Sequence, residues 1–287
     1  MQITLLGGSG FIGRHLAAHL RGRGDTVVTG SLRAGTAPAA AQLCAGSDAV
    51  VNLAGAEVAR RWTTAHKAEI RSSRVDRTRE LMAELEKLPE ATRPKAYVVS
   101  SAIGYYGTSE TATFTEEDGP GADFLAEVCV ALEHEAERAR SLGMRLAILR
   151  IGIVLGADGG TLKALLPLYK LGLGGPIASG RQWISWIHIA DQVGLFTAAI
   201  DGASGIINST APQPVRNAVF AKALGRALNR PAILPTPAFA IRLAFGEGAT
   251  IVTEGQKVLP ARTQELGYEF VYPTLEGALE SALRQTE

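Results

Sequence analysis

Short apolar segments alternate with longer segments of helical periodicity over the first two-thirds of the chain. Most of the short segments are rich in β-branched residues, which is typical of strands that helices cover on both faces. They occupy residues 3–6, 26–29, 49–53, 96–100, 146–151 and 205–208, and helical spacing marks residues 11–21, 64–88 and 122–142. Strand–helix alternation of this kind implies right-handed crossovers. The pattern therefore predicts an α/β fold with a Rossmann-type, doubly wound parallel sheet.

The pattern changes after about residue 155, where glycine and proline become frequent. Such a composition is typical of loops and an appended lobe rather than of a continuing strand–helix repeat. We expect a Rossmann domain at 1–155, which also contributes the strand 205–208, and a smaller substrate-binding C-terminal lobe made of 156–204 and 209–287. Segments 242–245 and 275–283 are predicted to be amphipathic helices of this lobe. Residues 34–45 are few for a full helix-plus-strand unit, so we expect that part of the sheet to be trimmed.

Composition narrows the class of protein. Of 287 residues, 46% are apolar and 20% are charged, and the formal net charge is +1, so no basic field is available for nucleic acid. Cys44 and Cys129 have neither metal-ligand nor redox spacing, and no metal site is expected. The chain shows no run of 18 apolar residues and starts on a strand without signal-peptide features. We therefore expect a cytoplasmic protein that acts on a small molecule, with no membrane or nucleic-acid partner.

A glycine-rich turn joins the first predicted strand to the first predicted helix. Glycines allow a tight turn and close approach to a ligand, and the helix N-terminus offers backbone amides and a positive dipole end to a diphosphate. The alternative is a glycine-rich turn without a ligand. The pattern favours dinucleotide binding, and the predicted binding residues of this turn are Gly7, Gly8, Ser9, Gly10, Phe11, Ile12 and Gly13.

The end of the second strand indicates which dinucleotide is bound. Enzymes that prefer NAD place a carboxylate here for the adenosine ribose, and this chain has none between Thr26 and Asp48. Ser31 and Arg33 can instead donate to a 2′-phosphate, which favours NADP(H) as the cofactor, although Arg33 can also be an ordinary surface arginine. The third strand ends in small residues that leave room for the adenine–ribose side of the cofactor, namely Asn52, Leu53, Ala54 and Gly55.

Four motifs occur in the order found in extended short-chain dehydrogenase/reductases: GGSGFIG at 7–13, NLAG at 52–55, SSA at 100–102 and WIHIAD at 186–191. The chain resembles more closely an atypical branch of this NAD(P)-dependent epimerase/dehydratase-like group, usually called epimerase family proteins. The segments that carry this closer resemblance include RWT at 61–63, SR at 73–74, GYYG at 104–107, GLGGP at 172–176, GRQ at 180–182, PVRN at 214–217 and GQKVLP at 255–260. The resemblance spans nearly the whole chain. It implies a Rossmann domain, bound NADP(H) and a C-terminal domain of unassigned role.

The chain departs from the superfamily at the residues that perform its chemistry. The resemblance implies a Tyr general acid/base with a Lys four residues later, but these places hold Leu125 and Cys129, counted back from Glu133. Arg74 stands where the relatives have an Asn that orders the proton path. Ser101 remains as a hydrogen-bond donor to a substrate oxygen. Tyr105 and Tyr106 follow the same strand, and one of them is expected to face the pocket as a replacement acid/base, with a structural role as the alternative for Tyr106. The predicted catalytic residues are Ser101 and Tyr105.

The stretch 180–188 holds two indoles, a guanidinium and an imidazole. In the proteins that the chain resembles, this region lines the substrate cleft and anchors anionic groups. We therefore predict that Arg181, Trp186 and His188 bind substrate, with a structural ion pair as the alternative for Arg181 and a core position as the alternative for His188. Asp191 lies three residues after His188 and could orient its ring.

Two classes of function follow from these features. The first is an NADP(H)-binding, oxidoreductase-like protein that acts on a small carbonyl or alcohol through a non-standard acid/base or a solvent proton. The second is a catalytically silent NADP(H)-binding sensor, which the loss of Tyr and Lys favours. A sugar-nucleotide epimerase is disfavoured, because that reaction needs the missing pair. The resemblance also implies a homodimer through the helices 64–88 and 122–142.

Overall fold

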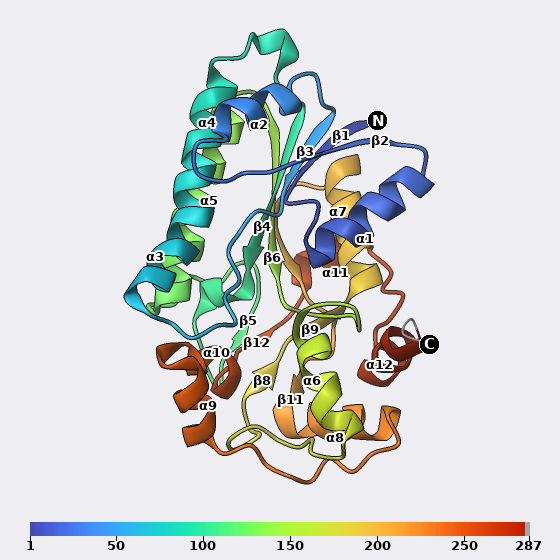
Figure 1. The fold of residues 1–287 in the computed structure, drawn as a ribbon. Coiled ribbons are helices and arrows are strands. Elements are labelled where there is room, and N and C mark those ends of the chain that lie inside the picture. Colours follow the sequence, from blue (N-terminus) through green and yellow to red (C-terminus); the bar gives the residue numbers. More distant parts are fainter. Residues whose placement is uncertain (285–287) are drawn as a thin grey trace.

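A six-stranded parallel sheet forms the centre of the computed structural model, which describes residues 1–284 (Figure 1). The strand order is β10-β6-β4-β3-β1-β2. The strands are β1 (Gln2–Leu6), β2 (Thr26–Gly30), β3 (Ala49–Asn52), β4 (Ala96–Ala102), β6 (Arg145–Ile151) and β10 (Gly205–Ser209). Each predicted strand is present, with its ends shifted by at most two residues. The predicted fold class is confirmed.

Helices cover both faces of this sheet (Figure 1). The core of one face is closed by α1 (Phe11–Gly22) and α7 (Ile189–Asp201). The core of the other is closed by α2 (Ala37–Cys44), α4 (Arg77–Glu86) and α5 (Phe124–Ser141). The helix predicted at 64–88 is α3 (Thr64–Arg71) followed directly by a π-helical turn (Ser72–Asp76) and α4. One extra residue per turn in this segment changes the direction in which its side chains point.

Strand β2 forms one edge of the sheet. Between β2 and β3 the chain forms α2 and no strand, so β2 has β1 as its one neighbour among the described strands. The chain then returns to the other side of β1, where β3 pairs with it from Ala49 to Asn52.

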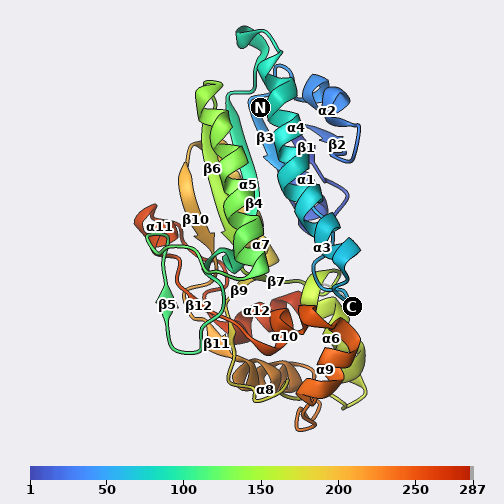
Figure 2. The same ribbon diagram turned by 90° about the vertical axis from the view of Figure 1, so that its left-hand side faces the viewer.

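A smaller lobe lies against the carboxyl ends of the strands (Figure 2). Its core contains the fully buried Trp186 and side chains from three helices, α6 (Gly160–Lys170), α8 (Asn217–Ala227) and α12 (Leu275–Arg284). Pairs of short strands stabilise it: β5 (Thr113–Phe114) pairs with β12 (Lys257–Val258), β7 (Ile153–Leu155) with β9 (Trp186–His188), and β8 (Trp183–Ile184) with β11 (Val215–Arg216).

The remaining helical segments of the described chain are α9 (Ala238–Phe245), α10 (Thr250–Thr253), α11 (Ala261–Glu265) and the 3₁₀ turns Glu90–Thr92, Ile103–Tyr106 and Glu247–Ala249. The last three residues of the predicted lobe, 285–287, lie outside the described residues.

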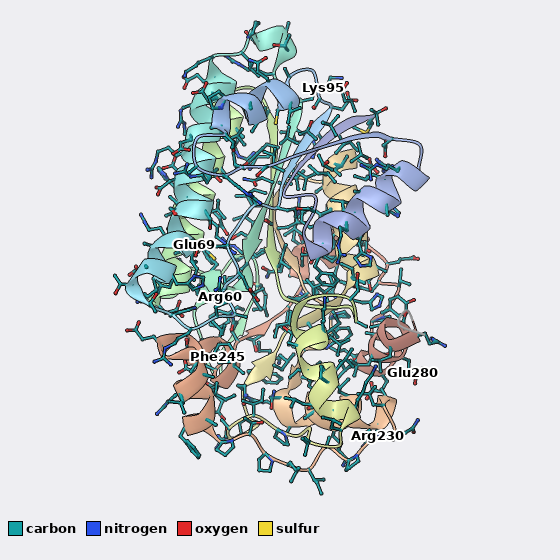
Figure 3. The ribbon with its side chains drawn as sticks, viewed as in Figure 1. Arg60, Glu69, Lys95, Arg230, Phe245 and Glu280 are labelled. Atoms are coloured by element: carbon teal, nitrogen blue, oxygen red, sulfur yellow. The ribbon has the colours of Figure 1, made fainter. Side chains whose placement is uncertain are left out.

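The lobe and the sheet meet at the loop that follows β3. Figure 3 shows Arg60 of this loop and Phe245 at the end of α9 on the same side of the molecule. The Trp62 amide donates to the Phe245 carbonyl at 3.0 Å. Among residues 1–284, no helix is long and apolar enough to cross a bilayer, and no group of three metal-ligating side chains is found.

Candidate functional site

The glycine turn after β1 leaves the N-terminus of α1 open. Gly7 has φ +85°, a backbone conformation that favours glycine, and its carbonyl accepts the Gly10 amide at 3.1 Å. Gly10 is the N-cap of α1, and no side chain caps the helix there. The first amides of a helix have no intrahelical acceptor. The turn therefore presents donors and the positive end of the helix dipole to an anion.

The turn is compact because its glycines have no side chains. A Cβ on Gly13 would lie 2.7 Å from the Gly7 carbonyl oxygen, and a Cβ on Gly7 would lie 2.9 Å from the Leu53 carbonyl carbon. A Cβ on Gly159, in the loop before α6, would lie 2.3 Å from the Phe11 ring. Glycine at these positions allows the helix, the β3 loop and the lobe to approach one another. The cradle thus formed suits a dinucleotide diphosphate.

A cavity of about 280 Å³ adjoins this turn. Several residues predicted to bind the cofactor line it, namely Gly7, Gly10, Phe11, Ile12, Gly13, Leu53, Ala54 and Gly55. The predicted residues Gly8, Ser9, Ser31, Arg33 and Asn52 lie outside that lining. Asn52 shapes the turn instead, since its Oδ1 accepts the Ala54 amide at 3.0 Å and its Nδ2 donates to the Tyr97 hydroxyl at 2.8 Å. Ser31 and Arg33 are exposed beyond the end of β2.

A second cavity, of about 270 Å³, continues from the first toward the lobe. Arg74, Ala102, Cys129 and Ile151 line both. The second cavity has aromatic and aliphatic walls, which include Trp62, Phe124, Leu125, Ile153, Trp183 and Ile251. Two adjoining spaces of this kind, one beside a glycine cradle and one apolar, have the arrangement of a coenzyme pocket and a substrate pocket.

The positions of the missing acid/base pair face this second cavity. Leu125 and Cys129 both line it. Burial and the nearby Glu133 carboxylate raise the pKa of the Cys129 thiol to about 11. The thiol is therefore protonated at neutral pH and supplies no positive charge in place of a lysine.

Ser101 lines the first cavity, but its hydroxyl proton is directed away from it. The buried Oγ donates to Glu133 Oε1 at 2.6 Å. Glu133 is held by Arg150, whose Nε and Nη2 donate to the two carboxylate oxygens at 3.0 and 2.8 Å. Ser101 can therefore offer an oxygen lone pair to a ligand while Glu133 holds its proton.

Tyr105 and Tyr106 belong to the same buried cluster. The Arg150 Cζ lies 3.3 Å from the centroid of the Tyr105 ring. Tyr106 donates to Asn208 Oδ1 at 2.7 Å, and burial raises its pKa to about 12. Neither tyrosine is among the residues that line the two cavities. Acid/base catalysis by Tyr105 stays a prediction that its described contacts do not favour.

The three residues predicted to bind substrate in the second half lie apart from the cavities. Arg181 forms an exposed ion pair with Glu110, with Nε 2.6 Å from Oε1. Trp186 is fully buried in the lobe core and donates to the Gln213 carbonyl at 3.0 Å. The cavity indole of this stretch is Trp183. Substrate binding by Arg181, Trp186 and His188 stays a prediction.

His188 lies at the N-cap of α7. Its Nδ1 accepts the Ala190 amide at 3.1 Å, and its ring contacts Tyr272 in a tilted arrangement with the centroids 4.0 Å apart. Asp191 turns away from it and accepts the Val271 and Tyr272 amides at 2.7 and 3.0 Å. His188 is fully buried, and burial lowers its pKa from 6.5 to about 4.

This pKa predicts a pH-dependent stability. Between pH 6.5 and 4 the unfolded chain binds a proton at His188 that the folded chain does not, so stability falls as the pH falls through this range. The shift corresponds to about 3 kcal/mol at its acid limit. The H188N variant keeps a capping acceptor and removes the titration. We expect a flatter dependence of its unfolding free energy, measured in urea at pH 7, 6, 5 and 4. Parallel curves for the two proteins would contradict this account.

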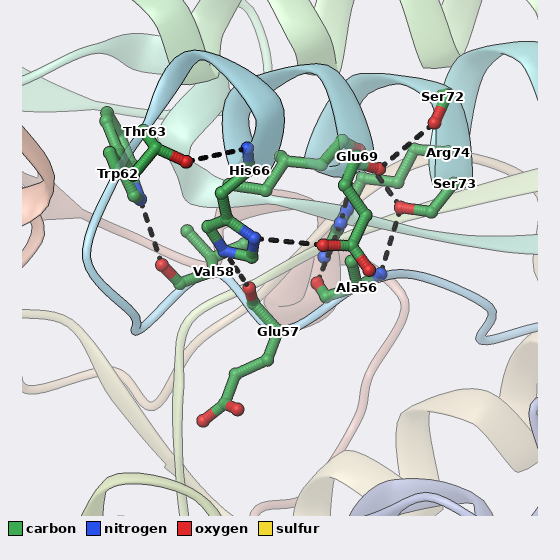
Figure 4. Close-up of polar contacts among 11 residues, drawn as sticks. Ala56, Glu57, Val58, Trp62, Thr63, His66, Glu69, Ser72, Ser73 and Arg74 are labelled. Carbon is green, nitrogen blue, oxygen red and sulfur yellow. Dashed lines mark hydrogen bonds and ion pairs between the residues drawn. The ribbon is translucent and has the colours of Figure 1, made fainter.

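Arg74, which stands at the place of the relatives' proton-path Asn, lines both cavities, although it was not among the predicted binding residues. It comes from the π-helical turn. Its Nη1 donates to the Ala56 carbonyl at 3.0 Å and the Ile70 carbonyl at 3.4 Å. Figure 4 shows that the loop after β3 is fastened to this helix, with the Ala56 amide donating to Ser73 Oγ at 2.9 Å. The sequence RSSR at 71–74 has no feature that predicts the π-helical turn, which directs the Arg74 side chain into the cavities.

Comparisons with known proteins find two family models that match the chain and relatives that are similar to it over nearly its whole length. The model described as "NAD dependent epimerase/dehydratase family" matches residues 3–209, and a domain of unknown function, DUF1731, matches residues 236–282. The chain is 42% identical over 303 residues to the Arabidopsis thaliana "Epimerase family protein SDR39U1 homolog, chloroplastic", covering 99% of this chain and 87% of the relative. It is 38% identical to the mouse epimerase family protein SDR39U1, covering 99% of this chain and 100% of the relative.

A solved structure of an epimerase family protein is also similar to this chain. The crystal structure of human epimerase family protein SDR39U1 (isoform 2) with NADPH matches with a TM-score of 0.89 and 35% identity, over 99% of both chains. These matches confirm the resemblance inferred from the sequence motifs. The coenzyme predicted from the end of β2 is the one in the human crystal structure.

Proposed function

Because this chain belongs to the NAD-dependent epimerase/dehydratase family as an SDR39U1-like epimerase family protein, we propose that it binds NADP(H) and acts as an oxidoreductase on a small carbonyl or alcohol. The observation that carries this proposal is the pair of adjoining cavities that share Arg74, Ala102, Cys129 and Ile151. One cavity lies at the glycine cradle, and the other is apolar and of a size for a small molecule.

The residues present fit the coenzyme. The uncapped N-terminus of α1 and the glycines of its turn offer amides to a diphosphate. When bound, NADPH would supply a hydride equivalent to a carbonyl carbon, and the carbonyl oxygen would need a proton to become an alcohol. The presence of NADPH in the human relative's crystal structure supports the same choice of coenzyme.

The chain's own residues would orient the substrate more than they would transfer protons. Ser101 has its proton held by Glu133, and the pKa of Cys129 lies at about 11. We propose that the proton comes from water, so turnover is slow by the standard of relatives with a Tyr/Lys pair. The test is loss of NADPH absorbance with a panel of small aldehydes and ketones, compared with the S101A and Y105F variants. Unchanged activity in the S101A/Y105F double variant would exclude both predicted catalytic residues.

A silent NADP(H)-binding sensor is the second proposal, favoured by the raised pKa of Cys129 and the apolar Leu125 at the acid/base positions. Tight NADPH binding with no oxidation by any carbonyl compound in the panel would support it over the reductase. The same two residues weigh against a sugar-nucleotide epimerase. A homodimer through α3–α4 and α5 stays a prediction, for which light scattering after gel filtration is the measurement. Cytoplasmic location also stays a prediction.

Substitution of Arg33 tests whether the protein prefers NADPH to NADH. We propose that its guanidinium and the Ser31 hydroxyl bind the 2′-phosphate. The R33D variant should lose roughly 10- to 100-fold in NADPH affinity and little in NADH affinity, because a charge-assisted contact becomes a repulsion. Titrations of intrinsic tryptophan fluorescence measure both constants. R21D, an exposed site on α1 of the same domain, is the control. Equal losses for the two coenzymes in R33D would remove Arg33 from this role.

A further inference from the structure

Arg74 is an arginine without a carboxylate partner in a mostly apolar space. Within residues 1–284 no acidic side chain lies within ion-pair distance of it, and its hydrogen bonds are the two that Nη1 makes to backbone carbonyls. Burial lowers the pKa of its guanidinium. The two arginines of the inner strand β6 differ from it: Arg150 has Glu133 as its partner, and Arg145 donates to carbonyls at the C-terminal end of α7. A cation of this kind is stabilised by an anionic ligand.

The fold makes specific room for this guanidinium. A Cβ on Gly55 would lie 2.8 Å from the Arg74 Cζ, so the side chain occupies space that glycine leaves open. The π-helical turn Ser72–Asp76 carries Arg74 into that space, and such turns occur often at functional sites. The loop before Trp62 is bound to α3, which leads directly into this turn, since the Glu57 carbonyl accepts from His66 Nε2 at 2.9 Å (Figure 4).

The other polar side chains around the second cavity have protein partners. Asp123 caps α5 by accepting the Ala126 amide at 2.9 Å, and Glu254 accepts the Thr108 hydroxyl at 2.8 Å. Gln256 Nε2 donates to the Ile103 carbonyl at 2.9 Å. The remaining ones are bonded in the same way, Ser185 to the Gln256 carbonyl and Thr250 to the Glu247 carbonyl. Asp123 and Glu254 line the cavity from exposed positions, and Arg74 is the one cation among the described lining residues.

Aromatic side chains set the shape of these walls. Trp62 and Phe124 pack edge to face with their centroids 5.2 Å apart, and Trp183 lines the same cavity. A volume of about 270 Å³ lies just below the range of drug-sized sites, roughly 300–1,000 Å³. A nucleoside diphosphate sugar is larger than this, and the polar side chains that line the cavity already make hydrogen bonds within the protein, which leaves few partners for sugar hydroxyls.

We propose that the substrate is a small carboxylic acid with an apolar, ring-sized body, whose carboxylate binds the Arg74 guanidinium. The proposal rests on the proposed function, because Arg74 lines the coenzyme cavity as well and so holds the acid end near the reacting centre. Trp62, Phe124 and Trp183 surround the apolar body. Arginine suits a carboxylate through its planar, two-pronged donor geometry.

The test uses matched probes on the whole protein saturated with NADP⁺. 3-Phenylpropionate, its primary amide and UDP-glucose are titrated by calorimetry. We expect the acid to bind roughly 10- to 100-fold more tightly than the amide, which has nearly the same shape without the charge, and UDP-glucose to bind more weakly than the acid. R74Q should bring the ratio of acid to amide close to one, whereas R71Q, an exposed site one turn earlier, should keep the wild-type ratio.

Gly55→Ala offers a second perturbation, which displaces the guanidinium without removing its charge and should also lower the ratio. A wild-type ratio near one, no measurable binding of the acid, or tighter binding of UDP-glucose would each overturn the proposal, whether or not a variant folds. A weaker affinity of R74Q for NADPH with an unchanged ratio would assign Arg74 to the coenzyme and overturn it too. NADPH titration of the wild type separates the two failures, since absence of NADPH binding would reject the proposed function itself.

Discussion

The G10V variant should remain folded and lose NADPH affinity by roughly 100-fold or more, equivalent to about 3 kcal/mol. Gly10 has φ −71° and ψ 174°, which any residue adopts, and an added Cβ would lie 3.4 Å from the Gly7 carbonyl oxygen, an ordinary contact. The fold therefore accepts a side chain at this position. The coenzyme does not, because Gly10 lines the first cavity at the helix end where the diphosphate is proposed to bind.

The measurement is a titration of NADPH against tryptophan fluorescence, with the melting temperature of the free protein as the measure of folding. G22V is the matched control, since Gly22 ends the same helix and a Cβ there would meet nothing within 4 Å. It should bind NADPH as the wild type does. G13A makes an instructive contrast, because its Cβ would lie 2.7 Å from the Gly7 oxygen, so both folding and binding should suffer. Wild-type affinity in G10V would reject the cradle as the diphosphate site.

The features that sequence predicted well are local. The six strands of the sheet were found because each is a short apolar run bounded by turn residues, and strands buried on both faces have that composition. The glycine turn at 7–13 was recognisable for the same reason, since a strand, a tight turn and a helix start follow one another directly. The strand order β10-β6-β4-β3-β1-β2 was not predicted, because the rule of right-handed crossovers sets the hand of each connection and not which strands become neighbours.

The lobe and the site depend on contacts that no local pattern contains. The Ser101 hydroxyl bonds Glu133, 32 residues away, and Arg181 bonds Glu110, 71 residues away. Trp183 and Trp186 are three residues apart, yet one lines a cavity and the other fills a core, because they lie on different short strands, β8 paired with β11 and β9 paired with β7. Periodicity predicted one helix over 64–88 and could not indicate the single π turn that carries Arg74 into the site.

The buried pair of Glu133 and Arg150 predicts the largest loss of stability. Arg150 is 1% exposed, and Glu133 binds it through both carboxylate oxygens. Burial opposes the charge of Arg150, but its hydrogen bonds and ion pair with Glu133 raise its pKa above the usual value. E133Q leaves this cation buried without its counter-ion. Removing one partner of such a pair costs about 3–5 kcal/mol, and we expect the unfolding free energy of E133Q to fall by that amount.

An exposed pair on the same helix gives the control. Glu137 and Arg140 of α5 lie 2.8 Å apart, with both side chains 50% exposed, so E137Q should change the unfolding free energy by less than about 1 kcal/mol. The chemical change is identical in the two variants, and burial is the main difference between them. Replacing both charges, as in E133Q/R150M, should recover part of the loss because no unpaired charge remains buried. Urea unfolding at pH 7, followed by circular dichroism, measures all three variants. Equal effects of E133Q and E137Q would mean that water reaches Arg150, and the isolation of the Ser101 proton from the coenzyme cavity would then no longer follow.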